Sequence, residues 1–318
     1  MLILGATGFL GGWLTKRLID EGARVHCLVR GRKRKSQFFL GGLAEKAHVV
    51  DGAAEDQRAI DALFASDSLD AVFHLASLVD VNAALQRPLE MFQSSVDSTL
   101  RILEHVRQRS QQTAVIVASS DKAYGSQPLP FQEDKPLQPA HPYEVAKAAQ
   151  DLLTQFYGKV HKLNTAVTRC GNFFGGWDFA FERIIPFCIR EALFKRAPVL
   201  RSDGKFTRDF LYMEEAVNAN LLLARKVVEE PGLRGEAFNF SHEVDIEIGQ
   251  LAEMICQKLD PSLRPIFQGI TKAEIRQMRL DTSKAKTILG WQAELDFDEG
   301  LDRTIAWYRQ NRSLWSEP

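Results

Sequence analysis

The sequence is poor in cysteine. Its 318 residues contain four, Cys27, Cys170, Cys188 and Cys256, which lie far apart and form no Cys-x-x-Cys pair. This spacing excludes the disulfide frameworks of small secreted proteins and the usual zinc and thioredoxin-like motifs. The histidines form no metal-spaced cluster either. We therefore expect reduced, structural thiols and no bound metal.

Long hydrophobic runs and an excess of one charge are also missing. No apolar run approaches the ~20 residues that a membrane-spanning helix needs. The formal net charge is −1, so no overall field favours nucleic acid or an anionic membrane as a partner. The first residues, MLILGATGFLGG, lack the charged and long apolar regions of a signal peptide. The expectation is a globular cytoplasmic protein that binds neither nucleic acid nor membrane.

What the sequence does have is a regular alternation of short apolar runs with longer helical patterns. This order predicts parallel βαβ units, in which helices bury both faces of the strands. Right-handed crossovers then give a doubly wound (Rossmann) α/β sheet. We expect strands at 2–4, 25–29, 71–75, 114–118 and 165–168, and helices at 13–21, 89–107 and 143–157.

The alternation of strand and helix patterns is interrupted at two places along the chain. Residues 127–142 contain five prolines, which exclude regular structure and predict a long loop above the sheet. After Gly175, turn-rich segments interrupt short helices. We therefore predict a first domain of residues 1–174, to which the chain returns at about 210–245. The remainder of 175–318 is predicted to be a smaller, discontinuous α/β lid.

A glycine turn follows the first strand and opens the first helix, with the sequence GATGFLG over residues 5–11. Glycine suits a tight turn at which the backbone approaches a pyrophosphate, and the helix start offers N–H groups and a positive dipole. The alternative is a plain structural turn. We expect a dinucleotide to be bound by Gly5, Thr7, Gly8, Phe9, Leu10 and Gly11, and by Leu75 and Ala76 beyond a later strand.

The end of the second predicted strand distinguishes NAD from NADP. A carboxylate there binds the ribose 2′-hydroxyl of NAD, whereas an arginine suits the 2′-phosphate of NADP. The strand here runs into Arg30 and a basic stretch over residues 30–35 that has no carboxylate. A solvated basic loop is the alternative interpretation, and a nucleic-acid patch a less favoured one. We favour NADP over NAD, with Arg30 as the discriminating residue.

Tyr143 and Lys147 are four residues apart in a predicted helix, so the ammonium can lie beside the phenol. Such a positive charge favours the phenolate and lowers the pKa of the tyrosine from about 10 toward neutrality. The tyrosine could then act as a general base. The alternative is a surface helix with an ordinary ion pair.

Two charged residues, Asp121 and Lys122, directly follow Ser119 and Ser120 at the end of the strand 114–118. Open α/β sheets place their active sites at the carboxyl ends of parallel strands. On composition alone, a solvated loop start is the simpler interpretation. The position nevertheless makes both residues candidates for acid–base chemistry beside Tyr143.

These motifs, in this order along the chain, resemble the short-chain dehydrogenase/reductase superfamily. The G-x-x-G-x-x-G spacing is similar to that of its extended, nucleotide-sugar branch. The resemblance implies that Ser120 hydrogen-bonds the substrate hydroxyl, that Tyr143 takes its proton, and that Lys147 also holds the nicotinamide ribose. Where this branch has asparagine in N-V-x-G-T, the chain has Ser95. A homodimer through the helices at 89–107 and 143–157 is also implied.

The residues after Ser120 resemble those of nucleotide-sugar 4,6-dehydratases. Together with the stretches 141–147 and 169–176, they are closest in motif to CDP-glucose 4,6-dehydratases. The resemblance implies oxidation at C4 of the hexose, elimination of water across C5 and C6, and hydride return to C6. It makes Asp121 the acid that protonates the leaving hydroxyl and Lys122 the base that removes the C5 proton. Lys122 must be neutral for this role, and burial or nearby cations would favour that form.

The same resemblance identifies candidates for binding a nucleotide diphosphate, which needs fixed cations and amide donors. It implies contacts from Asn172, Arg183, Arg208 and Arg279. For each arginine the alternative is a solvated surface charge. The implied substrate is a nucleotide-diphosphate hexose that is CDP-, UDP-, GDP- or dTDP-linked, and these motifs do not distinguish the base or the hexose.

Two other functions fit the same residues. A sugar 4-epimerase or keto-reductase would use Tyr143 and leave Asp121 and Lys122 as binding residues. A non-catalytic NAD(P)-binding scaffold would need none of them, but Ser120, Tyr143 and Lys147 are all present. The leading prediction is an NAD(P)-dependent nucleotide-sugar 4,6-dehydratase.

Overall fold

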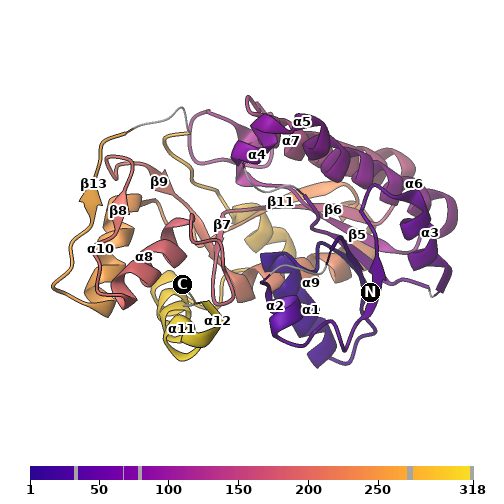
Figure 1. The fold of residues 1–318 in the computed structure, drawn as a ribbon. Helices are drawn as coiled ribbons and strands as arrows, with labels where there is room; N and C mark the ends of the chain where they lie inside the picture. The colour runs from indigo at the N-terminus through magenta and orange to yellow at the C-terminus, as the bar shows by residue number, and fades with distance from the viewer. Residues whose placement is uncertain (32–34, 67, 78–80, 271–274, 316–318) are drawn as a thin grey trace.

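The computed structural model describes residues 1–318 except 32–34, 67, 78–80, 271–274 and 316–318. Two parts lie side by side, a sheet between layers of helices and a smaller lid that carries the C-terminus (Figure 1). Both parts are needed for the clefts described below, because the sheet's carboxyl ends face the lid.

A seven-stranded sheet forms the larger part, with the order β11-β6-β5-β4-β1-β2-β3 and parallel pairing throughout. Because helices cover both faces, most of its strands are continuous apolar runs, and the predicted Rossmann sheet is confirmed. The strands are β1 (Leu2–Leu4), β2 (His26–Val29), β3 (His48–Asp51), β4 (Ala71–His74), β5 (Ala114–Ala118), β6 (Thr165–Cys170) and β11 (Glu236–Phe240).

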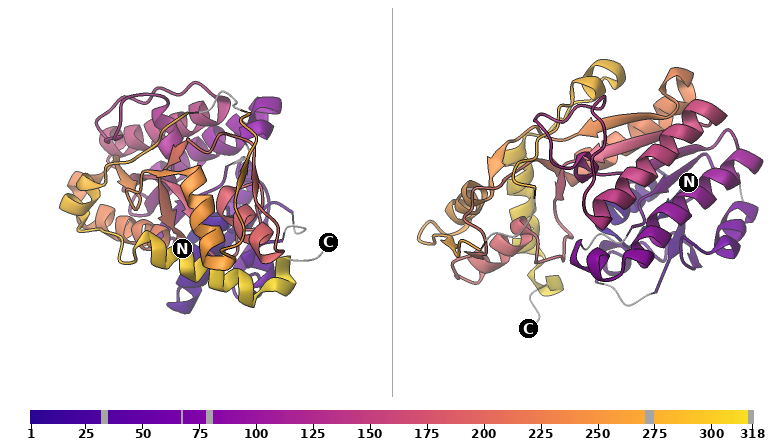
Figure 2. Two further views of the ribbon diagram at one scale, coloured as in Figure 1. Left: turned by 90° about the vertical axis from the view of Figure 1, so that its left-hand side faces the viewer. Right: turned by 90° about the horizontal axis from the view of Figure 1, so that it is seen from above.

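Successive residues of a strand point to opposite faces of the sheet, and two cores result. Ile3 belongs to the core under α1 (Phe9–Asp20), α2 (Gln37–Leu40) and α9 (Met213–Glu229). Leu2 belongs to the core under α3 (Gln57–Ser66), α6 (Ser98–Arg109) and α7 (Pro142–His161). Figures 1 and 2 show these helices as layers on the two sides of the sheet.

Two predicted helices differ in their bounds. α1 begins at Phe9 rather than Trp13, because the glycine turn ends at once and Gly8 is the N-cap residue. The helix predicted over 89–107 consists of α5 (Pro88–Phe92), a π-helical segment η1 (Gln93–Asp97) and α6. The apolar spacing in the sequence does not distinguish a wider π turn from an α turn.

The lid has a core of its own, built largely from aromatic side chains such as Phe174, Phe297 and Tyr308. Its helices are α8 (Ile184–Leu193), α10 (Ile248–Leu259), α11 (Phe297–Gln310) and α12 (Arg312–Trp315). Its strands pair two by two: β7 (Asn172–Phe174) with β10 (Phe210–Tyr212), β9 (Thr207–Arg208) with β12 (Ile246–Glu247), and β8 (Val199–Leu200) with β13 (Ile266–Phe267).

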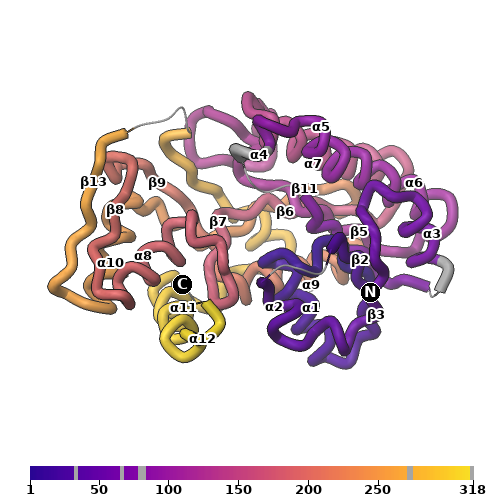
Figure 3. Tube along the Cα trace, in the orientation of Figure 1, coloured from indigo at the N-terminus to yellow at the C-terminus, as the bar shows by residue number. Residues whose placement is uncertain are grey.

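The chain runs from the sheet into the lid, returns to the sheet at α9 and β11, and enters the lid again (Figure 3). Residues Ala285, Leu289 and Trp291 also pack into the first core, although they lie beyond β11. Shorter elements complete the chain: α4 (Val81–Gln86), η2 (Asp121–Tyr124), η3 (Pro231–Leu233) and η4 (Ala285–Leu289). Within the described residues, no helix is long and apolar enough to cross a membrane.

Candidate active site

The glycine turn forms one wall of a cleft at the carboxyl edge of the sheet. Gly5 has φ +95°, and a Cβ there would lie 2.9 Å from the Ala76 nitrogen. A Cβ on Gly11 would lie only 2.1 Å from the Gly5 carbonyl oxygen. The N-cap residue Gly8 makes no side-chain cap, so the helix start presents backbone N–H groups to the cleft. The turn therefore fits a dinucleotide pyrophosphate.

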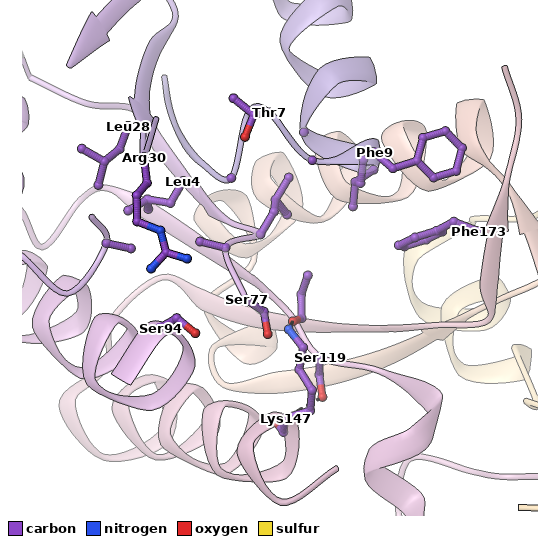
Figure 4. Close-up of a pocket in the computed structure, with 18 of the residues that line it drawn as sticks. Leu4, Thr7, Phe9, Leu28, Arg30, Ser77, Ser94, Ser119, Lys147 and Phe173 are labelled. Carbon is purple, nitrogen blue, oxygen red and sulfur yellow. Dashed lines mark hydrogen bonds between the residues drawn. The ribbon is translucent and has the colours of Figure 1, made fainter. Parts of the chain in front are cut away.

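The structure brings all the sequence-predicted cofactor residues together in this cleft. Figure 4 shows Thr7, Arg30 and Lys147 around it, with Phe9 and Phe173 at one end. Sequence reasoning missed Ser77 and Ser94, which also line it. The only signal for Ser94 was the serine-rich stretch that replaces the usual asparagine motif, and nothing in the sequence singled out Ser77. The predicted residues in the lining are Gly5, Thr7, Gly8, Phe9, Leu10, Gly11, Arg30, Leu75, Ala76, Tyr143 and Lys147.

Arg30, at the end of β2, has a carboxylate beside it that the sequence did not reveal. Its Nη1 lies 3.5 Å from Glu55 Oε1, and both residues line the cofactor cleft. Positions 32–34 of the basic stretch lie outside the described residues. The cleft thus holds both a cation and a carboxylate near the end of β2.

A second cleft opens between the sheet and the lid, and Tyr143 lines both clefts. Arg183 also lines both, and its Nη1 lies 3.1 Å from Asp178 Oδ2. Arg279 is among the lining residues of neither cleft, so its role as a diphosphate clamp stays a prediction. The other predicted residues that line the second cleft are Ser120, Asp121, Lys122, Asn172 and Arg208.

Three of these residues form a compact polar cluster at the end of β5. Ser120 is the N-cap of the short 3-10 turn η2, and the Lys122 backbone N–H donates to its Oγ. The Ser120 hydroxyl donates to Asp121 Oδ1 at 2.9 Å, and Lys122 Nζ donates to the same oxygen at 3.2 Å. The tight turn places all three side chains in the lining of the second cleft.

Asn172 joins this cluster from β7. Its Oδ1 accepts from Lys122 Nζ at 3.2 Å, while its Nδ2 donates to the Asp209 carbonyl at 3.0 Å. The amide is therefore oriented by the lid with its oxygen toward Lys122. Lys122 Nζ has two oxygen acceptors, Asp121 Oδ1 and Asn172 Oδ1, as its hydrogen-bond partners, and the expectation that burial or nearby cations favour a neutral amine stays a prediction.

Tyr143 and Lys147 lie at the start of α7, where His141 and Glu144 form a capping box. Lys147 is buried and donates to the Ala118 carbonyl at 2.8 Å, and burial lowers its pKa to about 8. Burial also raises the pKa of Tyr143 to about 12, although a hydrogen bond with Ser120 opposes this. The expected lowering of the tyrosine pKa is therefore wrong for this structure, because desolvation outweighs the lowering effects of Ser120 and Arg183, and Lys147 makes no resolved contribution.

Asp209 organises the lid around Arg208, and sequence reasoning missed it. Its buried carboxylate accepts from the backbone N–H groups of Phe210, Val244 and Leu280 at 2.9, 3.1 and 3.0 Å. Burial raises the pKa of Asp209 to about 7. Three chain segments are thus tied together beside the predicted diphosphate arginine.

A buried ion pair supports α7 behind the cluster. Arg169 of β6 donates from Nε and Nη2 to the two oxygens of Asp151, at 2.8 and 3.0 Å. The two side chains are 2% and 0% exposed. The remaining nitrogen of Arg169 donates to Tyr124 Oη at 2.8 Å, and that hydroxyl donates to Asn239 Oδ1. The network joins α7 to η2, β6 and β11.

The sequence matches a known protein family over most of its length. The family described as GDP-mannose 4,6 dehydratase matches residues 2–304. The chain belongs to this family. GDP-mannose 4,6-dehydratase family proteins are extended short-chain dehydrogenase/reductases, as the order of the motifs had indicated.

Relatives of this family member include both dehydratases and epimerases. It is 28% identical to a dTDP-glucose 4,6-dehydratase of Xanthomonas campestris pv. campestris, over 98% of the chain and 93% of the relative. The structure of UDP-glucose 4-epimerase from Thermotoga maritima, with UDP-glucose, superposes with a TM-score of 0.87 and 24% identity, covering 98% of this chain and 99% of that one. The structure of dTDP-glucose 4,6-dehydratase from Bacillus anthracis, in complex with NAD, superposes with a TM-score of 0.84 and 22% identity. The match covers 99% of this chain and 98% of that one.

His74 is buried at the end of β4, its Nε2 lies 2.8 Å from Ser98 Oγ, and burial lowers its pKa to about 3. It is therefore a neutral, buried side chain in contact with Ser98. The described residues contain no group of three or more His, Cys, Asp or Glu that could hold a metal ion.

Proposed function

We propose that the chain catalyses the NAD(P)-dependent 4,6-dehydration of a nucleotide-diphosphate hexose. One observation carries this proposal: the acid–base cluster Ser120, Asp121 and Lys122 meets Tyr143 where the two clefts join. A redox tyrosine alone serves many reactions. An adjoining carboxylate and amine add the acid and base that elimination of water requires.

The first chemical step belongs to Tyr143, Ser120 and Lys147. When bound, the nicotinamide supplies oxidising power by accepting hydride from C4 of the sugar and returning it later to C6. Tyr143 takes the C4 hydroxyl proton, Ser120 hydrogen-bonds that hydroxyl, and Lys147 holds the cofactor ribose. Tyr143 lines the cofactor cleft, so a bound oxidised nicotinamide would bring a positive charge that favours the phenolate, against the burial that raises the pKa of Tyr143 to about 12.

The elimination step belongs to Asp121 and Lys122. The C4 ketone acidifies the C5 proton, which Lys122 removes, while Asp121 protonates the departing C6 hydroxyl. Both groups line the cleft that also holds Asn172, Arg183 and Arg208, three candidates for contacts with the nucleotide diphosphate. Arg279 remains a fourth candidate. The arginines are suited to bind the diphosphate while the hexose lies beside Asp121 and Lys122.

A 4-epimerase or keto-reductase is the second candidate, because the Thermotoga maritima structure of similar fold is an epimerase. Such an enzyme needs Tyr143 but no acid and base at C5 and C6. The presence of both Asp121 and Lys122 in the lining of the second cleft, beside Tyr143, argues for the dehydratase.

The choice between NAD and NADP depends on Arg30 and Glu55. Arg30 suits a 2′-phosphate, and on that basis we propose NADP. NAD is the alternative, favoured by the carboxylate of Glu55 and by the NAD complex of the Bacillus anthracis relative. For location, we propose a reducing cytoplasm, since all four cysteines are buried and unbonded.

Incubation with nucleotide hexoses tests the function. Purified protein is mixed with CDP-, UDP- and dTDP-glucose and with GDP-mannose, each with NAD⁺ or NADP⁺. We expect one donor to give a 4-keto-6-deoxy product, seen as a chromophore in alkali, and NADP⁺ to support the higher rate. A C4-inverted sugar would instead support the epimerase, and no reaction with any donor would support the scaffold.

We further propose that the chain forms a homodimer through α4, α5, α6 and α7. These helices carry seven large apolar side chains that are 36–69% exposed. On α7 they fall on one face of the helix, and Figure 2 shows α6 and α7 running together at the surface. The residues are Leu85, Leu89, Leu100, Val145, Leu152, Phe156 and Val160.

Leu152→Glu tests the dimer, because in a two-fold interface one substitution introduces two charges. We expect the variant to sediment as a monomer at concentrations where the parent protein is a dimer, with dissociation favoured by roughly tenfold or more. Leu40→Glu changes another exposed leucine, on α2 and outside these helices. It is the control and should leave sedimentation unchanged. A parent protein that sediments as a monomer would contradict the proposal.

A further inference from the structure

The side-chain amide of Asn172 lies between Lys122 and the backbone of the lid. We propose that Asn172 is a positioning residue, which fixes the amine of Lys122 in the orientation that removes the C5 proton of the hexose. This inference rests on the proposed dehydratase function. It gives Asn172 a part in the elimination step, in addition to the diphosphate contact that the sequence resemblance implies.

Two oxygen atoms from different parts of the fold hold the Lys122 amine. Nζ donates to Asp121 Oδ1 from η2 and to Asn172 Oδ1 from β7, in both cases at 3.2 Å. The nitrogen has three bonding positions besides its carbon, which the neutral amine fills with two N–H bonds and a lone pair. When both N–H bonds point at these oxygens, the lone pair takes the third position. Since Lys122 lines the second cleft and its side chain is 28% exposed, the lone pair can face a bound hexose.

The Asp209 carbonyl fixes the Asn172 side chain in turn. It accepts from the Asn172 backbone N–H at 2.9 Å and from Asn172 Nδ2 at 3.0 Å. A carbonyl can only accept a hydrogen bond, and a lysine N–H can only donate one. The amide nitrogen must therefore face Asp209 and the amide oxygen must face Lys122, so the two partners leave the amide one orientation.

Asp209 is itself fixed by backbone donors. Its buried carboxylate accepts from three backbone N–H groups, those of Phe210, Val244 and Leu280. Gly171 allows the Asp209 backbone to approach Asn172, because a Cβ at position 171 would lie 3.2 Å from the Asp209 carbonyl oxygen. The contacts therefore connect Lys122 to a firmly bonded part of the lid.

A contact with the diphosphate does not by itself account for this arrangement. The oxygens of an ionised diphosphate only accept hydrogen bonds, and so does the amide oxygen, so Asn172 Oδ1 cannot hydrogen-bond the diphosphate. One N–H of Nδ2 donates to Asp209, and the second is left for the substrate. The two roles are therefore compatible, and the oxygen is the atom that serves Lys122.

The rates of the two chemical steps in Asn172→Ala test the proposal. The variant is mixed with a saturating amount of the active donor among CDP-, UDP- and dTDP-glucose and GDP-mannose, so that a weaker diphosphate contact does not affect the rates. Absorbance of reduced nicotinamide reports C4 oxidation, and the alkaline chromophore reports elimination. We expect product formation to fall by about 10²-fold, the effect that misplacing a reacting group by about 1 Å can have, with C4 oxidation at the rate of the parent protein. Deuterium at C5 should slow the remaining product formation, because removal of that proton then limits the rate.

Asn164 provides a matched control. Its Oδ1 accepts from Arg234 Nε at 2.9 Å, and its Nδ2 donates to the Gln112 carbonyl at 3.0 Å. This is the bonding pattern of Asn172, but Asn164 precedes β6 and so lies at the amino end of the strand, away from the clefts. Asn164→Ala should keep the parent's ratio of product formation to cofactor reduction, whatever it does to stability.

Product formation by Asn172→Ala at the parent's saturating rate would overturn the proposal, since the amide oxygen would then not be needed. Equal losses of C4 oxidation and elimination would also overturn it, because the contact would then serve binding or the fold. Asn172→Leu keeps the shape of the side chain and should show the same split between the two steps, so the outcome does not depend on the folding of one variant.

Failure of the proposed function would look different. The unmodified enzyme would then form no 4-keto-6-deoxy product from any nucleotide hexose, although it could still reduce its cofactor. The role of Asn172 in elimination would be refuted together with the function.

Discussion

Replacing Lys122 by methionine is expected to abolish dehydration while leaving C4 oxidation in place. Methionine keeps the length of the side chain but removes the amine that takes the C5 proton. Tyr143, Ser120 and Lys147 remain, so the variant should still reduce its cofactor on addition of the nucleotide hexose. We expect product formation to fall by about 10²–10⁴-fold, the usual contribution of a general base.

Two optical readings separate the steps: the near-ultraviolet absorbance of reduced nicotinamide and the alkaline chromophore of the product. Lys46→Met is a matched control, because Lys46 is exposed and precedes β3. It therefore lies at the amino ends of the strands, whereas the clefts lie at their carboxyl ends. It should change neither reading. Normal product formation by Lys122→Met would refute the dehydratase assignment, whereas loss of both readings would mean that Lys122 is needed for binding or oxidation.

Replacing Arg169 by methionine is expected to lower the free energy of unfolding by about 3–5 kcal/mol, the usual cost of breaking a buried ion pair. The substitution leaves the Asp151 carboxylate, which is 0% exposed, without its two guanidinium hydrogen bonds. It also removes the donor to Tyr124. Urea denaturation followed by circular dichroism measures the loss.

Arg303→Met is the control for this second prediction. Arg303 pairs with Glu214 and Glu299, but its side chain is 47% exposed, and such surface pairs contribute about 0–1 kcal/mol. The double variant Arg169→Met/Asp151→Leu should regain much of the stability, because an apolar pair leaves no unpaired buried charge. A loss in Arg169→Met no larger than that in Arg303→Met would contradict this account.

Much of the sheet was predictable because strand and helix signals depend on local chemistry. The run 114–118 is buried on both faces, and its apolar residues bound β5 as predicted. The π-helical segment Gln93–Asp97 was not predictable, since its extra residue per turn comes from packing and leaves the apolar spacing nearly unchanged. The helical pattern of the sequence predicted that α1 begins at Trp13. The helix begins earlier because the backbone at Gly8 already forms its N-cap.

The site divides in the same way. The glycine turn, Tyr143 and Lys147 are close in sequence to the elements that place them, so their spacing and order along the chain were enough to predict them as candidates. Asp209 and Glu55 act through contacts with segments far along the chain, and no local pattern marks them. The raised pKa of Tyr143 could not be predicted from the sequence either, because its main cause is burial, which depends on the whole fold.

If the proposed dimer forms, the position of α7 would make catalysis depend on the amount of protein present. Its first two turns carry Tyr143 and Lys147, while its outer side is apolar and exposed at Val145, Leu152, Phe156 and Val160. If a second copy covers that side, mass action makes the folded state of the helix depend on enzyme concentration. By thermodynamic linkage, ligands that order the first turn would then strengthen the pairing of the copies. Substrate supply and subunit assembly would thus be coupled through one helix.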